Sequence, residues 1–304
     1  MSRFEVLILG NSSALPAYGR HPSGQVVNIH EQYLLIDCGE GTQDRLIQYH
    51  IKPHRLDHIF ISHLHGDHYF GLPGLITSMN LSGRKHPLHI YSPEGLSDLI
   101  DLVIQVADST LNFDIKWNVL KGEKSILLVD DGVKQIKAFP LRHRIPTYGF
   151  VIRERPGQRI FRMDLFGDDL PPYTAIKQLK SGHDVTTSEG KILHALDYTF
   201  EPNPPRSYAY CSDTVYDPNI VPHILQNNLI YHEATYADEH KDKAKENFHS
   251  TAKEAAEIAL KSGAAKLLIG HFSSRYKLLD HILEEARTVF DKTELAVEGK
   301  WFKV

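Results

Sequence analysis

The sequence predicts an α/β protein in which two β-sheets pack together and helices lie outside them. Three observations lead to this fold class. Short apolar runs with strand character alternate with helical segments, and the order of strands followed by helices occurs twice along the 304 residues. One segment rich in proline, glycine and basic residues follows neither period. We therefore expect a single domain over residues 1–304 with an inserted arm at 153–182.

The first half of the chain is expected to alternate between strands and helices. Thr42 would cap the first helix, because its hydroxyl can accept a hydrogen bond from a first-turn amide. Pro73 lies in the first turn of the second helix, where its missing N–H costs nothing. In chain order, the expected elements are strands at 4–10, 25–30 and 33–39, a helix at 42–50, a strand at 56–63, a helix at 71–83, a strand at 86–93 and a helix at 96–110.

The second half is richer in strands and returns to mixed structure near its end. Its best-marked helix has a capping box formed by Thr251 and Glu254, and Gly263 lies just past its last turn. The expected elements are strands at 125–129, 133–143, 148–154, 207–213 and 227–235, a helix near 251–262, a strand at 265–272 and a helix near 278–290.

Residues 153–191 interrupt this pattern with prolines, glycines and basic side chains. A plain surface loop is one interpretation of this segment. A structureless loop of such length is uncommon in a compact domain unless it has a function. We therefore interpret the segment as an excursion from the core rather than as a linker between domains.

Composition restricts the class of protein. No run approaches eighteen apolar residues, so no membrane-spanning helix is expected, and the apolar run at 4–9 is too short for the core of a signal peptide. Two cysteines, Cys38 and Cys211, cannot form a disulfide framework and are expected to be buried thiols. These features predict a cytoplasmic protein. The formal charge of −4 argues against nonspecific coating with nucleic acid, although a local basic patch would suffice for an RNA substrate.

The segment "SHLHGDHYFGLPG" at 62–74 indicates a metal centre. His63 and His65 are two residues apart at the end of a strand, so their side chains leave the same face and can bind one cation. Gly66 permits a sharp turn, after which Asp67 and His68 would point toward a second cation. Imidazole and carboxylate ligands suit zinc, with manganese or iron as alternatives.

Four residues cannot complete two metal sites, so further ligands must come from elsewhere in the chain. Each of three candidates, His143, Asp213 and His271, follows an apolar strand-like run. A buried polar side chain there would cost several kcal/mol (order of magnitude) without a partner. Hydrogen-bonded core groups are the alternative for each residue taken singly. As a set of ligand types at strand ends, they favour a shared site.

With these motifs the sequence resembles the metallo-β-lactamase superfamily and, within it, the ribonuclease Z family. The resemblance covers Phe4 to about Tyr276, and the segments that separate ribonuclease Z from lactamases, glyoxalases and lactonases are "GLPG", "HEAT" at 232–235 and "HST" at 249–251. The motifs shared with the superfamily appear in the family's order: "LLIDCGEGTQ", "HLHGDH", "PLRH", "SDT" and "GHFSSRY".

The resemblance implies an αββα sandwich of two mixed sheets flanked by helices, with a protruding arm. It also implies that Asp213 bridges two Zn²⁺ ions per subunit and that Asp37 orients ligand histidines from behind. The implied ligands of one zinc are His63, His65 and His143, and those of the other are Asp67, His68 and His271.

The implied activity is that of a zinc-dependent endoribonuclease that removes 3′ trailers from tRNA precursors. Two metals about 3.5–4 Å apart would share a hydroxide that attacks the phosphodiester, leaving a 3′-hydroxyl on the tRNA and a 5′-phosphate on the trailer. Asp67 would also position the hydroxide. His249, held by Glu233, would protonate the leaving oxygen. Without the resemblance, His249 would be interpreted only as a polar residue before a helix.

The family's arm grips the tRNA elbow, and the family works as a homodimer. By resemblance we expect the same partners here, with backbone contacts that position the RNA without reading its bases. The basic residues expected to bind the substrate are Arg153, Arg155, Arg159, Arg162, Lys177 and Lys180.

Two alternative functions remain at this stage. A zinc phosphodiesterase acting on cyclic nucleotides or small phosphodiesters would share the metal motifs, but such relatives lack the arm. A non-catalytic RNA-binding protein with a vestigial site would not need to keep all the ligands together with Glu233 and His249.

Overall fold

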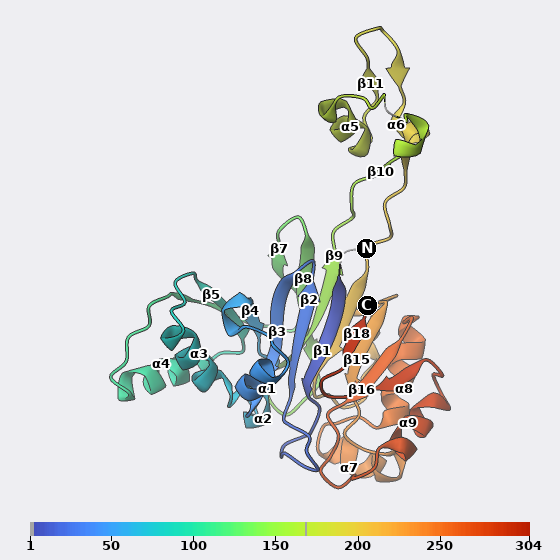
Figure 1. Cartoon of the computed structure of the whole chain (residues 1–304). Coiled ribbons are helices and arrows are strands. Elements are labelled where there is room, and N and C mark those ends of the chain that lie inside the picture. The colour runs from blue at the N-terminus through green and yellow to red at the C-terminus, as the bar shows by residue number, and fades with distance from the viewer. Residues whose placement is uncertain (1–2, 168) are drawn as a thin grey trace.

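The computed structural model describes residues 3–167 and 169–304, and it forms two seven-stranded sheets that pack face to face (Figure 1). This arrangement confirms the predicted α/β class. Both sheets are mixed, since each contains parallel and antiparallel neighbours. In order across the first sheet the strands are β18 (Trp301–Lys303), β1 (Phe4–Gly10), β2 (Gly24–Ile29), β3 (Gln32–Cys38), β4 (Leu56–Phe60), β5 (Leu88–Ser92) and β6 (Ile115–Val119).

The second sheet comes from the later part of the chain. Its strands β14 to β17 run parallel to one another, whereas β9 is antiparallel to both β14 and β8. In order across the sheet the strands are β17 (Thr293–Leu295), β16 (Leu267–Gly270), β15 (Leu229–Glu233), β14 (Ser207–Cys211), β9 (Thr147–Glu154), β8 (Lys134–Leu141) and β7 (Ile126–Asp130).

The main core lies between the sheets and is rich in aromatic side chains. Phe60 stacks on Tyr91 from the first sheet and contacts Phe150 from the second, with ring centroids 4.7 and 5.4 Å apart. Tyr210 and Tyr231 stack at 5.0 Å on neighbouring strands. Successive residues of a strand point to opposite faces, so the alternate positions form two further cores beneath the outer helices.

Helices cover the outer face of each sheet (Figure 1). None of those in the described residues is long and apolar enough to cross a membrane. The first sheet is covered by α1 (Thr42–Gln48), α3 (Leu72–Leu81) and α4 (Leu96–Val106), and the second by α8 (Ala252–Ser262) and α9 (Asp280–Arg287). Two short helices, α2 (Gly66–Tyr69) and α7 (Lys241–Glu246), lie at the lower end of the sandwich in Figure 1.

Most long elements match the sequence prediction, but the predicted cap at Thr42 is wrong. Gly41 is the N-cap residue of α1, at φ 82°, and no side chain caps that helix. Glycine adopts this left-handed conformation without the penalty that threonine would incur, so it takes the position before the helix. The capping box of Thr251 and Glu254 is confirmed, as is Gly263 at the C-cap of α8.

The segment after β9 leaves the sandwich and forms a separate small unit (Figure 1). Leu179, Leu193 and Ala195 are buried at its centre. The expected limits 153–182 differ from the structure, because Arg153 belongs to β9 and the chain rejoins the sheet only at Ser207. We call residues 155–206 the arm. Its elements are β10 (Ile160–Phe161), η2 (Met163–Leu165), α5 (Tyr173–Lys180), β11 (Val185–Thr186), β12 (Ile192–Leu193), α6 (Ala195–Tyr198) and β13 (Thr199–Phe200).

The arm and the predicted metal ligands lie at opposite ends of the second sheet. Asp213 and His271 follow the carboxyl ends of the parallel strands β14 and β16. The arm begins after the carboxyl end of the antiparallel strand β9 and returns at the amino end of β14. At about 3.3 Å per residue, the eight residues of β9 place roughly 25 Å between the two ends.

Candidate metal centre

The structure brings all seven predicted ligand side chains together at one edge of the sandwich. Within each of two groups, one donor atom per residue lies within 4.8 Å of the others. The ligands lie in the loops that follow β4, β8, β14 and β16, and these loops meet at this edge. The first group consists of His63, His65, His143 and Asp213, and the second of Asp67, His68 and His271.

In the first group, three imidazoles turn ring nitrogens toward one another. Nδ1 of His65 lies 3.1 Å from Nε2 of His63 and 3.2 Å from Nε2 of His143. Nδ1 of His143 donates to the carbonyl of Phe248 at 2.8 Å, which leaves the lone pair of Nε2 facing the group. Burial lowers the pKa of all three histidines, so they favour the neutral form that binds metal.

In the second group, a hydrogen bond from Nδ1 likewise fixes the orientation of each histidine ring. Nδ1 of His68 donates to Asp37 at 2.8 Å, and Nδ1 of His271 donates to Oγ1 of Thr235 at 2.9 Å. Thr235 can accept that bond because its own hydroxyl donates to Glu233. The Nε2 atoms of the two histidines therefore face each other, 3.3 Å apart.

Asp213 lies between the two groups. Its Oδ2 is 3.6 Å from Nε2 of His63, and its Oδ1 is 3.5 and 3.3 Å from Nε2 of His68 and His271. The residue is 2 % exposed, and its buried Oδ1 has no hydrogen-bond partner among the described residues. An unsatisfied buried carboxylate oxygen facing several imidazole lone pairs is costly unless a cation occupies the space between them. The donor set therefore fits bound metal.

Asp37 lies behind the ligands, fully buried at the end of β3. Besides the bond from His68, its carboxylate accepts hydrogen bonds from the amide and hydroxyl of Ser62 at 2.7 and 2.9 Å and from the hydroxyl of Tyr210 at 2.6 Å. Four donors fix the orientation of this carboxylate, which in turn fixes the His68 ring. The position agrees with the orienting role expected for Asp37.

Asp67 faces both His68 and His271 and is also held by the loop after β1. Its Oδ2 accepts a hydrogen bond from the amide of Ala14 at 2.8 Å. Burial raises the pKa of Asp67, but His68 and His271 outweigh that effect and hold it well below its usual range. Asp67 is therefore an ionised carboxylate, either as a ligand or as a group that accepts a hydrogen bond from water.

His249 and Glu233 form a buried pair beside the seven ligands. Nδ1 of His249 lies 2.9 Å from Oε1 of Glu233 and 3.9 Å from Asp213. Burial lowers the pKa of His249, but the carboxylate of Glu233, followed by those of Asp213 and Asp67, raises it to about 9. The imidazole is thus protonated at neutral pH, with Nε2 available to donate a proton.

Glu233 is 1 % exposed and accepts several hydrogen bonds, which keep it ionised. Burial raises its pKa, but His249, His271 and the surrounding donors lower it to about 2. The backbone amides of Thr214, Thr235 and Ser250 donate to it at 3.1, 3.0 and 3.1 Å. The amides of three different loops thus fix the carboxylate that holds His249.

The metal centre opens into a cleft of about 460 Å³. The cleft has two features that the sequence analysis missed. Arg144, next to a predicted ligand, is exposed and supplies a cation for a phosphate. The ring of Phe70 is 62 % exposed at the opening. Both have a sequence signal: Arg144 follows the motif histidine His143, and Phe70 lies within the segment at 62–74, directly before "GLPG".

The first glycine of "GLPG", Gly71, has a packing role. A Cβ atom on Gly71 would lie 2.2 Å from the carbonyl oxygen of Gly39 in the loop after β3, and only glycine permits that approach. The amide of Gly71 donates to the carbonyl of Cys38 at 2.9 Å. This contact fixes the start of α3, and with it the turn that carries Asp67 and His68, against the strand that carries Asp37.

The predicted substrate-binding residues are far from the metal centre, and several have acidic partners. Arg155 pairs with Asp130, Arg159 with Glu201, and Arg162 with Asp164. Arg153 projects from the outer face of the second sheet, outside the arm. Lys177 and Lys180 lie in the last turn of α5. Over residues 155–206 seven basic side chains are matched by seven acidic ones, so the arm has no formal net charge, and these ion pairs leave few of its arginines free.

Both cysteines are buried free thiols, as expected. Cys211 shares its strand with Tyr210 but packs in the apolar core beneath α8. It is not part of either ligand group among the described residues.

Comparison with known proteins relates almost the whole chain to proteins named ribonuclease Z, and a family model of a different name matches its first half. The chain is 42% identical over 301 residues to a protein named ribonuclease Z from Porphyromonas gingivalis, with 98% of each chain covered. A ribonuclease Z of Bacteroides fragilis is 41% identical over 299 residues, again with 98% of each covered. The family model described as "Anti-Pycsar protein Apyc1" matches residues 4–162.

Solved structures show the same fold. The short form of human tRNase Z superposes with a TM-score of 0.73 at 29% identity, covering 99% of each chain. The metallo-β-lactamase fold protein YhfI of Bacillus subtilis superposes with a TM-score of 0.70 at 19% identity over the full length of both chains. The likeness to YhfI establishes the fold alone.

Proposed function

The chain belongs to the ribonuclease Z family, and from this premise we propose that it is an endoribonuclease that removes 3′ trailers from precursor tRNA. The observation that carries the proposal is the buried His249–Glu233 pair, which stands beside the seven convergent ligands. A metallohydrolase cleaving a phosphodiester with a poor leaving group requires such an acid next to its metal ligands.

We propose that two divalent cations, zinc in preference to manganese or iron, bind in the two ligand groups. His63, His65 and His143 would hold one, His68, His271 and Asp67 the other, and Asp213 would bridge them. Such cations polarise a phosphate and lower the pKa of water, so that a nucleophile is available near neutral pH. The donor set of five imidazoles and two carboxylates suits this choice of metal.

Each side chain in the cleft would then have a separate role in hydrolysis. The ionised carboxylate of Asp67 orients the attacking water and accepts its hydrogen bond, and Arg144 binds the phosphate from the cleft wall. The new bond forms between the water oxygen and phosphorus, and the bond from phosphorus to the ribose 3′-oxygen breaks. His249 donates its proton to that oxygen, with Glu233 holding the ring. The tRNA keeps a 3′-hydroxyl and the trailer a 5′-phosphate.

The arm would bind the tRNA away from the cleft. Because the arm leaves the opposite end of the second sheet from the metal centre, an RNA held by it must span the body or reach another subunit. We therefore propose a homodimer in which the arm of one subunit serves the cleft of its partner, acting on tRNA in the cytoplasm. Light scattering of the purified chain would give twice the monomer mass, and a monomer that is fully active would contradict the arrangement.

Substrate comparison tests the proposed function against the alternative. Purified protein would be given a 3′-extended precursor tRNA, a cyclic nucleotide and bis(p-nitrophenyl) phosphate under the same metal conditions. Efficient trailer removal, with a much higher kcat/KM on the tRNA, is expected. Turnover of cyclic nucleotides or the small diester without cleavage of the tRNA would instead support a small-phosphodiester hydrolase.

A further inference from the structure

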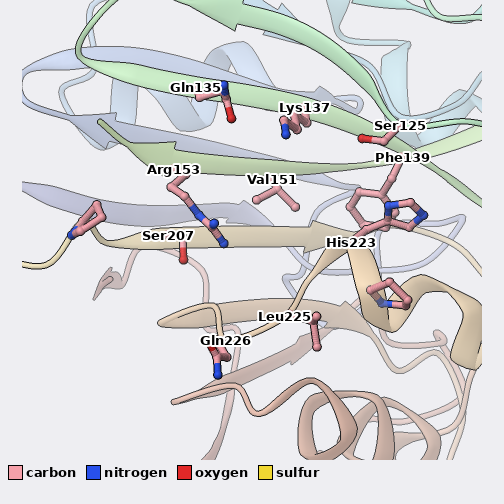
Figure 2. A pocket seen from close by; sticks show the side chains of 12 residues that line it. Ser125, Gln135, Lys137, Phe139, Val151, Arg153, Ser207, His223, Leu225 and Gln226 are labelled. Carbon is pink, nitrogen blue, oxygen red and sulfur yellow. The ribbon is translucent and has the colours of Figure 1, made fainter. Parts of the chain in front are cut away.

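A second cavity, of about 630 Å³, lies on the outer face of the second sheet at the root of the arm (Figure 2). Its floor is formed by β8, β9 and β14, and one wall by the end of the 3₁₀ segment η3 (Pro218–His223) and the turn after it. Arg153 and Ser207 are, respectively, the second-last residue of β9 and the first residue of β14. The cavity therefore adjoins both chain segments that lead into the arm.

The cavity is cationic. Lys137 and Arg153 project from the same face of neighbouring strands, because the register pairs Gln135 with Arg153 and Lys137 with Val151. This places the two cations diagonally across the strand pair, at roughly 7–8 Å between backbone positions. Both side chains are exposed, and no ion pair involving either is found within the described part of the chain.

Neutral donors complete the lining, and acids are missing from it. Gln135, Ser207 and Gln226 also line the cavity; the amide nitrogen of Gln135 donates to Asp130 at 3.3 Å, and the hydroxyl of Ser207 donates to Oδ1 of Asn228 at 3.5 Å. None of the twelve residues that line it carries a carboxylate. Like charges at diagonal positions repel each other, and this repulsion is relieved when an anion lies between them. The arm arginines differ in this respect, because acidic side chains already neutralise them.

The cavity persists because the helical layer is incomplete here. α8 and α9 cover the apolar outer side chains of β15 and β16, and η3 packs on β8 near Phe139, whose ring stacks on His223 at 5.4 Å. Beyond that stack toward the arm, the outward positions of β8 and β9 are Lys137, Val151, Gln135 and Arg153, of which Val151 alone is apolar.

We propose that this cavity binds the phosphodiester backbone of RNA and is a second contact for the precursor tRNA, in addition to the arm. The proposal rests on the function proposed above, since it assumes an RNA substrate. Two exposed cations without an ion-pair partner among the described residues fit phosphate oxygens, and none of the residues that line the cavity carries a carboxylate. The position at the arm root places the cavity where RNA held by the arm approaches the body.

Binding measurements test the proposal without requiring catalysis. A fluorescent 3′-extended precursor tRNA would be titrated with protein in EDTA, which prevents turnover, at several salt concentrations. The variant carries Lys137→Ala and Arg153→Ala. The matched control carries Lys52→Ala and Lys85→Ala, two exposed lysines on the side of the first sheet that remove the same charge. Circular dichroism would verify that both variants are folded.

We expect Kd to rise roughly tenfold or more in the cavity variant, and the slope of log Kd against log salt to fall by about 1.4–1.8, since each lost phosphate contact removes about 0.7–0.9. The control should change Kd less than about twofold. With metal restored, kcat at saturating tRNA should stay at the wild-type value because the cavity is at the far end of the sheet.

A Kd and salt slope equal to those of the control would overturn the proposal. So would a variant that loses binding of inorganic pyrophosphate but binds the tRNA as well as wild type does, since the cavity would then serve a free anion. Failure of the proposed function is distinguishable: wild-type protein would bind the tRNA but not cleave it after metal is restored.

Discussion

Nδ1 of His249 lies 2.9 Å from the carboxylate of Glu233, both residues are buried, and His249 lines the cleft. The carboxylate raises the pKa of His249 to about 9, so the ring carries a proton at neutral pH. Because Nδ1 is engaged, the proton that can leave is the one on Nε2. This relationship is the basis of the first prediction.

His249→Ala should lower kcat on precursor tRNA by roughly 10²–10⁴-fold, the usual contribution of a general acid. The loss should be much smaller on bis(p-nitrophenyl) phosphate, whose leaving group departs without protonation. Steady-state kinetics on both substrates would measure the difference. The exposed histidine variant His54→Ala is the control and should behave as wild type. Equal losses on the two substrates would show that His249 is not the acid.

His65→Ala should abolish cleavage and lower the metal content, because Nδ1 of His65 joins His63 and His143 in the first ligand group. Metal analysis of wild type should give about two ions per chain and the variant about one or fewer. Affinity for precursor tRNA should be unchanged, since the arm is at the other end of the sheet. A variant that retains both metal and activity would contradict the ligand assignment.

Replacing residues 158–202 by a short glycine-serine linker should raise KM for precursor tRNA by tenfold or more and leave hydrolysis of the small diester unchanged. These limits remove the whole small core of the arm, which is formed around Leu179 and Leu193. Removing only 156–180 would expose Leu193. Parallel loss of both activities would mean that the arm stabilises the body.

The root of the arm provides a pH prediction. Glu154 accepts hydrogen bonds from the backbone and guanidinium of Arg206, which lies on the opposite chain segment leading into the arm, and from His30. Burial raises the pKa of Glu154, but the bonds from Arg206, followed by that from His30, lower it below its ordinary value of 4.5. A carboxyl group with a lower pKa in the folded state stabilises the fold above pH 4.5, and that contribution is lost as pH falls through the folded value.

Glu154→Gln should therefore lower the free energy of unfolding by about 1–3 kcal/mol at pH 7, and the difference from wild type should vanish in acid. Urea unfolding between pH 3 and 8 would measure it. The KM of the Glu154→Gln variant for precursor tRNA should rise while its kcat stays unchanged, because the arm is no longer held in one orientation. A difference in stability that does not depend on pH would contradict the role of the ionised carboxylate.

Strand ends explain why the ligand positions could be predicted from sequence. His143, Asp213 and His271 each follow a buried strand, and parallel strands of one sheet end at the same edge, so the three were expected to meet. The groups that orient them were not predictable. The carbonyl of Phe248 and the hydroxyl of Thr235 reach the histidines through loops that lie far apart in the sequence.

Charge partners explain what the arm sequence could not predict. Asp164 stands two residues from Arg162, so the neutralisation of that arginine is visible in the sequence, whereas Arg155 and Arg159 meet Asp130 and Glu201 only after folding. The two-residue strands of the arm are too short to show a period, so its true limits could not be predicted either. In contrast, the α8 capping box was recognisable because its two residues are local in sequence.

The central claim is that water, not a ribose hydroxyl, attacks the phosphodiester between tRNA and trailer, with the 3′-oxygen leaving. Cleavage of a 3′-extended precursor tRNA in ¹⁸O-labelled water, followed by mass spectrometry of both product ends, tests it most directly. We expect a single cut that leaves a 3′-hydroxyl on the tRNA and a 5′-phosphate on the trailer carrying one ¹⁸O. A 2′,3′-cyclic phosphate on the tRNA, or the label on the tRNA end, would contradict it.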